Sequence, residues 1–155
     1  MKTKIIGLAS SAAFLISVSA VFAVPATPSE CADIPDLVLK EGTEKTDTIN
    51  GTSGNDLIFG YGGPDTIDGK GGRDCIVGGP GADLLKGDNG ADVIFGDAGA
   101  DKLVGGDGAD KMWGGDGADL LQGNSNGDEL VGGLGQDKAE GGSGTDSCDA
   151  EAEVS

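Results

Sequence analysis

Aspartate recurs every nine residues through most of the 155-residue chain. Eleven aspartates keep this spacing without an insertion: Asp56, Asp65, Asp74, Asp83, Asp92, Asp101, Asp110, Asp119, Asp128, Asp137 and Asp146. Carboxylates placed in this way can ligate hard cations or, in pairs, act as the acids of a glycosidase. The strict phase favours cation ligation as their use.

The composition gives little support to other kinds of catalysis. The chain contains no histidine, so no serine or cysteine can be activated by an imidazole base. The same absence excludes a metalloprotease zinc motif. We therefore expect that the protein is not an enzyme.

The first 23 residues have the pattern of a secretory signal peptide. Lys2 and Lys4 precede an apolar run over residues 5–21, and small residues then favour cleavage after Ala23, with Ala20 as the second choice. An uncleaved membrane anchor is the alternative, although the run is short for a bilayer. We expect a secreted, extracellular protein, with the periplasm or the cell surface as alternative destinations.

The net charge of the exported chain also points to cations. Without the two lysines of the signal it carries 8 basic and 27 acidic residues, a net charge of −19. Such a chain is a poor partner for nucleic acid or an anionic membrane.

The aspartates occupy position six of a nine-residue repeat. Position four is glycine in ten of eleven repeats, with Asn126 as the exception, and position eight is mostly branched and apolar, from Ile58 to Leu130. A degenerate copy at residues 42–50 precedes the others and has Lys45 at position four. Position one is always glycine: Gly51, Gly60, Gly69, Gly78, Gly87, Gly96, Gly105, Gly114, Gly123, Gly132 and Gly141.

Each position has a physical reason. Glycines at one and four permit positive φ in a tight turn and let the backbone approach a ligand closely. Positions seven to nine read as a short strand whose middle residue faces inward, because side chains alternate across a strand. Two repeats, or 18 residues, then close one coil. A glycine-rich disordered chain is the alternative, but disorder does not require branched residues in a fixed phase.

The segments GGDGADKMW (residues 105–113) and GGDGADLLQ (residues 114–122) resemble the RTX (hemolysin-type) calcium-binding repeat GGxGxDxUx. The resemblance covers residues 42–149. It implies an all-β, right-handed parallel β-roll (β-solenoid) of about 11–12 nonapeptide repeats. The expected organisation is a signal peptide at 1–23, a leader or N-terminal cap at 24–41, the roll at 42–149 and an acidic tail at 150–155.

The same resemblance implies Ca²⁺ between neighbouring turns on each edge of the roll. The implied ligands are the eleven aspartates, with Asp47 as a doubtful twelfth, and backbone carbonyls of the first four positions, including those of the eleven position-one glycines. Each ion lies between one repeat and the next but one, which sets a ceiling of nine ions, or ten if the degenerate copy contributes. Without ions, carboxylates about 4.8 Å apart repel each other, so we expect folding to depend on calcium.

The two faces of the roll differ in composition. On the face formed by the odd repeats, counted from Gly51, position nine is apolar until Asp149 in the last repeat; on the even face it is mixed and charged. An exposed apolar stripe indicates a contact surface, so the leader, a second copy, another protein or a polysaccharide could cover it. The stripe consists of Phe59, Val77, Phe95, Trp113 and Val131.

Three cysteines in an exported chain suggest one disulfide and one free thiol. Cys75 and Cys148 lie four coils apart, roughly 19 Å at the usual strand spacing, which exceeds the limit of about 7 Å for a bridge. Cys31 must therefore take part, and we favour a bond to Cys75 over one to Cys148.

These observations predict a secreted calcium-binding protein whose roll folds on binding Ca²⁺, with a structural, scaffold or cell-surface role. The alternative is a recognition module in which calcium supplies only rigidity and the apolar odd-repeat face binds a protein or a polysaccharide.

Overall fold

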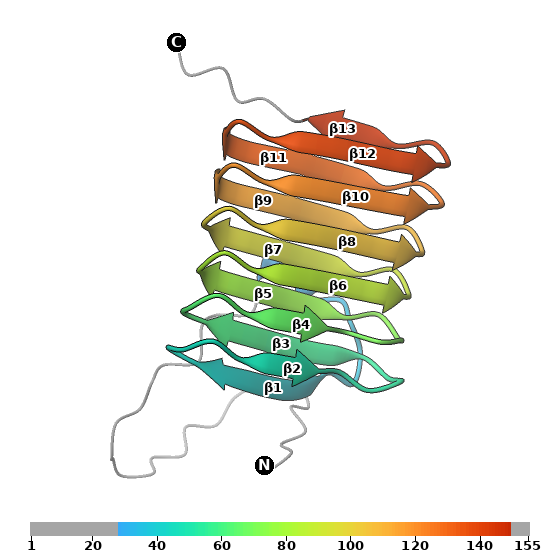
Figure 1. Cartoon of the computed structure of the whole chain (residues 1–155). Helices are drawn as coiled ribbons and strands as arrows, with labels where there is room; N and C mark the ends of the chain where they lie inside the picture. Colours follow the sequence, from blue (N-terminus) through green and yellow to red (C-terminus); the bar gives the residue numbers. More distant parts are fainter. Residues whose placement is uncertain (1–27, 150–155) are drawn as a thin grey trace, which may run out of the picture.

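The computed structural model describes residues 28–149 as one stack of coils (Figure 1). The predicted signal peptide and acidic tail lie outside the described residues. The expected parallel β-roll is confirmed. Its strands are β1 (Val38–Thr43), β2 (Thr48–Asn50), β3 (Asp56–Tyr61), β4 (Thr66–Asp68), β5 (Cys75–Pro80), β6 (Leu84–Asn89), β7 (Val93–Ala98), β8 (Lys102–Asp107), β9 (Lys111–Gly117), β10 (Leu120–Ser125), β11 (Glu129–Gly135), β12 (Lys138–Ser143) and β13 (Ser147–Asp149).

The strands alternate between two parallel sheets. One sheet has the order β1-β3-β5-β7-β9-β11-β13, and the other has the order β12-β10-β8-β6-β4-β2. Every strand pairs with the strand two places along the chain, in a register of 18 residues that places Ile58 beside Ile76 and Ile76 beside Ile94. Odd repeats therefore supply six strands of the seven-stranded sheet, with β1 as the seventh, and two repeats make one coil, as the period predicts.

Between the sheets runs a single ladder of position-eight side chains. Ile49 and Ala139 are partly buried at its two ends. Because each rung contacts the same position of the neighbouring coil, the ladder buries apolar surface without the large aromatic core that this composition lacks. The fully buried rungs are Ile58, Ile67, Ile76, Leu85, Ile94, Leu103, Met112, Leu121 and Leu130.

The glycines of position one have a different role from the one predicted. Positive φ occurs at positions two and four, for example at Gly99 (147°), whereas Gly60 at position one lacks it. A Cβ on Gly60 would lie 2.5 Å from the carbonyl oxygen of Gly78 and 2.6 Å from Oδ2 of Asp65. The prediction of positive φ at position one was wrong; the glycine is required there because neighbouring coils approach too closely for a side chain.

Many strands are also longer than the expected triplet, since the backbone continues in ladder pairing through positions one to three. In β6, residues Leu84–Asn89 extend from position seven of one repeat to position three of the next. The turn that carries each aspartate is correspondingly short, which holds its backbone rigidly between two strands.

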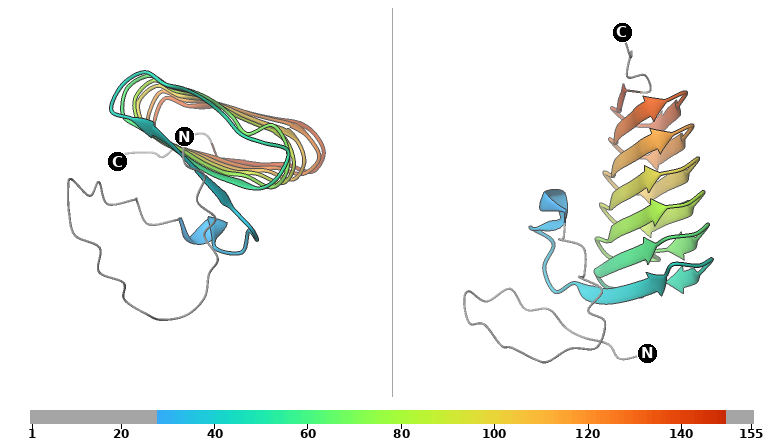
Figure 2. Two further views of the ribbon diagram at one scale, coloured as in Figure 1. Left: turned by 90° about the horizontal axis from the view of Figure 1, so that it is seen from below. Right: turned by 90° about the vertical axis from the view of Figure 1, so that its left-hand side faces the viewer.

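The leader segment, residues 28–37, lies against the outer face of the seven-stranded sheet (Figure 2). It begins with the short 3₁₀ turn η1 (Ser29–Cys31), and its Ile34 and Leu37 pack in one cluster with Leu57, Phe59, Cys75 and Val93. Cys31 is disulfide-bonded to Cys75, and Cys148 is free and exposed. The leader then enters β1, which pairs with β3.

This cover changes the apolar stripe expected from the sequence. Phe59 is only 1% exposed, so it is not available to a partner, contrary to the prediction. Val77, Phe95, Trp113 and Val131 remain partly exposed. Within residues 28–149, no helix has the length and apolar character needed to cross a membrane.

Candidate metal sites

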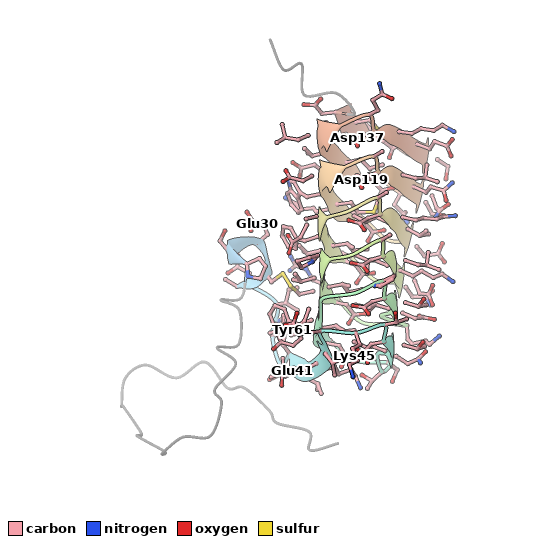
Figure 3. All side chains as sticks on the ribbon, turned by 60° about the vertical axis from the view of Figure 1, so that its left-hand side comes forward. Glu30, Glu41, Lys45, Tyr61, Asp119 and Asp137 are labelled. Carbon is pink, nitrogen blue, oxygen red and sulfur yellow. A yellow bond between two sulfur atoms is a disulfide. The ribbon has the colours of Figure 1, made fainter. Side chains whose placement is uncertain are left out.

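The position-six aspartates line the two edges of the roll in rows. Residues of one row are 18 apart in sequence and lie on successive coils, as Asp119 and Asp137 do in Figure 3. Nine of them, from Asp56 to Asp128, are at most 3% exposed, and Asp137 and Asp146 at the last coils are half-buried. The structure therefore brings the predicted residues together in the predicted order.

One carboxylate oxygen of each regular aspartate has a partner in the row. Oδ1 of Asp92 accepts a hydrogen bond from the backbone N–H of Asp74 at 2.7 Å, and Oδ1 of Asp110 accepts one from Asp92 at 2.8 Å. The pattern continues to Asp146, whose Oδ1 accepts from Asp128 at 3.0 Å. Each carboxylate thus fixes the turn of the preceding coil and is itself held in one orientation.

The other oxygen has no partner in the protein. It is buried and faces its own turn, where neither an N–H nor an O–H donor reaches it. A buried carboxylate oxygen without a donor is costly and calls for a cation or a proton. The nine such atoms are Oδ2 of Asp65, Asp74, Asp83, Asp92, Asp101, Asp110, Asp119, Asp128 and Asp137.

Burial raises the pKa of these carboxyl groups. The pKa of Asp74 rises to about 8, chiefly by desolvation, with the neighbouring carboxylates Asp92 and Asp56 adding to the shift. Desolvation likewise raises the pKa of Asp101 and of Asp110 to about 7, and that of Asp92 to about 6. Without a cation these carboxyl groups therefore keep their protons to a higher pH than exposed carboxyl groups do, and Asp74, with a pKa of about 8, is mostly protonated at neutral pH.

In several repeats a backbone carbonyl oxygen of the next coil lies near the unpaired carboxylate oxygen. A Cβ on Gly87 would lie 2.2 Å from Oδ2 of Asp92 and 2.8 Å from the carbonyl oxygen of Gly105 in the next coil. At Gly114 the corresponding distances are 2.4 Å to Asp119 and 2.5 Å to Gly132. The absent side chain of position one leaves a small cradle lined by carboxylate and carbonyl oxygens.

A family model described as the RTX calcium-binding nonapeptide repeat matches the chain in four copies, at residues 41–76, 72–103, 95–130 and 122–152. The chain belongs to this RTX family. No match is found among curated proteins.

The donor set of this RTX roll is suited to one class of ion. Within residues 28–149, no three acidic or cysteine side chains converge on one point, so backbone oxygens must supply part of any coordination shell. Calcium takes six to eight oxygens and accepts carbonyls beside carboxylates, whereas zinc prefers nitrogen and sulfur. The cradle lined by Oδ2 of Asp92 and the carbonyl oxygen of Gly105 therefore offers the kinds of ligand that calcium accepts.

Two RTX aspartates at the N-terminal end differ from the rest, a feature that sequence reasoning missed. Oδ2 of Asp56 accepts hydrogen bonds from Thr52, and Oδ2 of Asp47 accepts them from Thr43. Oδ1 of Asp56 is unpaired, because the residue 18 places earlier, Val38, donates its N–H to the carbonyl of Asn55 instead. The available signal was threonine at position two, which occurs in these two repeats alone.

Proposed function

We propose that the protein is an exported calcium-binding protein whose roll folds when Ca²⁺ binds between adjacent turns, and that it serves as a structural scaffold or cell-surface component. The observation that carries the proposal is that Oδ2 of nine position-six aspartates, from Asp65 to Asp137, is buried without a donor. The ligands proposed from the sequence, Asp56 to Asp146 with carbonyls of the turns, lie in two rows that suit such binding.

Coupled binding and folding follow from the same geometry. A cradle made of residues 18 apart exists only when neighbouring coils are stacked, so binding free energy becomes folding free energy. Without calcium, each row of aspartates places like charges close together in a buried environment, which destabilises the stacking of the coils. Calcium removes this repulsion and contributes attraction between coils.

The test is calcium titration of residues 24–155, followed by circular dichroism and calorimetry. We expect a weak strand signal in EDTA, a cooperative gain of strand signal on adding calcium, and several ions bound per chain. A strand spectrum that EDTA leaves unchanged, together with no heat of binding at millimolar calcium, would contradict the proposal.

Recognition of a protein partner is a second candidate function. Phe95 and Trp113 remain partly exposed and stack on each other, with ring centroids 4.9 Å apart and planes 11° apart. Stacking covers one face of each ring, which reduces the aromatic surface open to a sugar ring and disfavours a polysaccharide. Replacing both by serine should change the sedimentation of the calcium-loaded protein if the stripe binds a second copy, and should leave calcium-induced folding intact.

A further inference from the structure

In the first turn on each edge, Oδ2 of the aspartate accepts hydrogen bonds from the protein's own donors, whereas Oδ1 of Asp56 stays unpaired. Oδ2 of Asp56 accepts hydrogen bonds from the backbone N–H of Thr52 at 2.6 Å and from its hydroxyl at 2.9 Å. Oδ2 of Asp47 accepts both from Thr43, each at 2.7 Å. In the regular repeats from Asp65 to Asp137 the same oxygen has no donor at all.

The backbone φ angle at position two also distinguishes the first turn on each edge from the turns of the later repeats. Thr43 and Thr52 do not adopt positive φ, while position two of every later repeat does. Those later residues are Tyr61 (71°), Lys70 (83°), Gly79 (97°), Asp88 (72°), Asp97 (72°), Gly106 (121°), Gly115 (107°), Asn124 (77°), Gly133 (107°) and Gly142 (102°).

The side chain of threonine explains why Thr43 and Thr52 do not adopt positive φ. A β-branched side chain is strongly disfavoured at positive φ, whereas glycine, asparagine and aspartate tolerate it. With the ordinary φ of Thr52, its N–H points at Oδ2 of Asp56, and the hydroxyl adds a second donor to the same oxygen. The two donated hydrogen atoms carry partial positive charge and lie beside Oδ2 of Asp56, where a cation would otherwise bind.

We propose that Thr43 and Thr52 take the place of calcium in the first turn of each edge, so that the calcium rows begin at Asp65 and Asp74. This inference rests on the proposed function. It removes Asp47 and Asp56 from the ligand set. Five turns then remain on each edge, with four gaps between them, and the chain binds at most eight ions rather than nine or ten.

The decisive experiment exchanges the residue at position two and counts ions. Native mass spectrometry of the calcium-saturated chain gives the number bound, and circular dichroism shows that each variant is folded. Thr52→Gly permits positive φ and removes both the hydroxyl and the β-branch, so it should bind one ion more than the unmodified chain. Thr43→Gly should do the same, and the double variant should bind two more.

Matched controls separate the hydroxyl from the backbone. Thr52→Ser keeps the hydroxyl donor and should bind the same number of ions as the unmodified chain. Thr52→Val keeps the β-branch, so the N–H still faces Asp56; it should gain no ion and should unfold at a lower temperature. Because the valine variant alters only the donor, it tests the inference even if a glycine variant fails to fold.

The outcomes distinguish failure of the inference from failure of the function. Nine or more ions in the unmodified chain, or an equal count in the folded threonine and glycine chains, would overturn the replacement of calcium by threonine while leaving calcium binding in place. An additional ion in Thr52→Val would also overturn it. If none of the chains bound calcium, the proposed function would fail and the inference with it.

Discussion

The two ends of the roll are built from the same repeat but are stabilised by different means. In the N-terminal part, residues 28–77, the leader buries an apolar cluster, a disulfide joins Cys31 to Cys75, and threonines donate hydrogen bonds to Oδ2 of Asp47 and of Asp56. In the C-terminal part, residues 102–149, only Trp113 packs against that cluster, and the described residues contain no second disulfide.

From this difference we expect the two parts of the roll to depend on calcium to different degrees. Covalent and apolar interactions need no cation, whereas buried carboxylates without donors need a cation or a proton. We therefore expect the N-terminal part to retain order when calcium is absent and to serve as the template on which later coils add. The coils of the C-terminal part are joined by the inner ladder, by strand pairing and by the hydrogen bonds of the aspartate rows, without the leader or the disulfide.

Removal of calcium should produce the largest effect. In EDTA we expect the backbone amides of β11 and β12 to lose hydrogen-exchange protection first, and those of β3 and β5, beneath the leader, to keep it longest. Peptide-resolved exchange with mass spectrometry measures this. Magnesium should not restore protection, since it demands a small octahedral site and dehydrates reluctantly. Uniform loss along the chain would remove the distinction between the two parts.

The pH should have the next largest effect, because several carboxyl groups titrate together. The raised pKa values of Asp74, Asp92, Asp101 and Asp110, between about 6 and about 8, mean that the calcium-free roll binds protons which the unfolded chain has lost. Its stability is therefore greatest below about pH 4, the usual carboxyl range, and falls as the pH rises through 6 to 8. In chelator, strand content should be higher at pH 5 than at pH 8.

The control for this titration is the calcium-saturated protein, in which bound ions hold the carboxylates in their charged form. Its strand content should be nearly constant between pH 6 and pH 8. A calcium-free roll that gained strand content with rising pH would contradict the sign of the shift.

Loss of the disulfide should have an intermediate effect that falls on the N-terminal part. Cys31→Ser opens a bridge between residues 44 apart in sequence, and the chain-entropy relation gives about 4 kcal/mol for a loop of that length. Urea unfolding in saturating calcium should show the loss, and β3 and β5 should lose their exchange protection in EDTA. Cys148→Ser is the matched control, because that thiol is free and exposed; an equal loss in both variants would argue against the assigned pairing.

A single carboxylate should have the smallest effect. Asp110→Asn removes one charge from the middle of a row, and we expect the calcium midpoint of folding to rise about tenfold, since even outer-shell changes at metal sites cost 10–100-fold. The exposed Asp116, at position three, provides a control, because Asp116→Asn alters the net charge equally. Equal shifts in the two variants would indicate a general charge effect rather than ligation.

Most of the architecture could be predicted because the period determines it. A fixed spacing of nine places Ile58, Ile76 and Ile94 on one ladder and alternates the strands between two sheets, so a single unit read correctly gives the whole stack. The rows of aspartates follow from the same register. The distance between coils excludes a bond between Cys75 and Cys148, and the place of Cys75 near the N-terminal end, where the leader begins, favours it as the partner of Cys31.

The features that could not be predicted depend on contacts between coils or on segments outside the repeat. The close approach at Gly60 is set by the carbonyl of Gly78 in the next coil, which no single repeat reveals. The burial of Phe59 depends on Ile34 and Leu37 of the leader, which has no period. The different chemistry of Asp56 depends on the N–H and the hydroxyl of one residue, Thr52, at a position where the repeat tolerates many residues.

The bond between Cys31 and Cys75 also determines how the molecule would carry a mechanical load (Figure 3). A pull on the chain before Cys31 passes through the sulfur atoms to β5, so residues 32–74 form a closed loop that cannot be drawn out. Only the chain beyond Cys75 can lengthen, one coil at a time from the far end. A molecule held at its N-terminal end would lengthen under tension by unfolding its C-terminal coils, while the coils within the disulfide loop stayed folded.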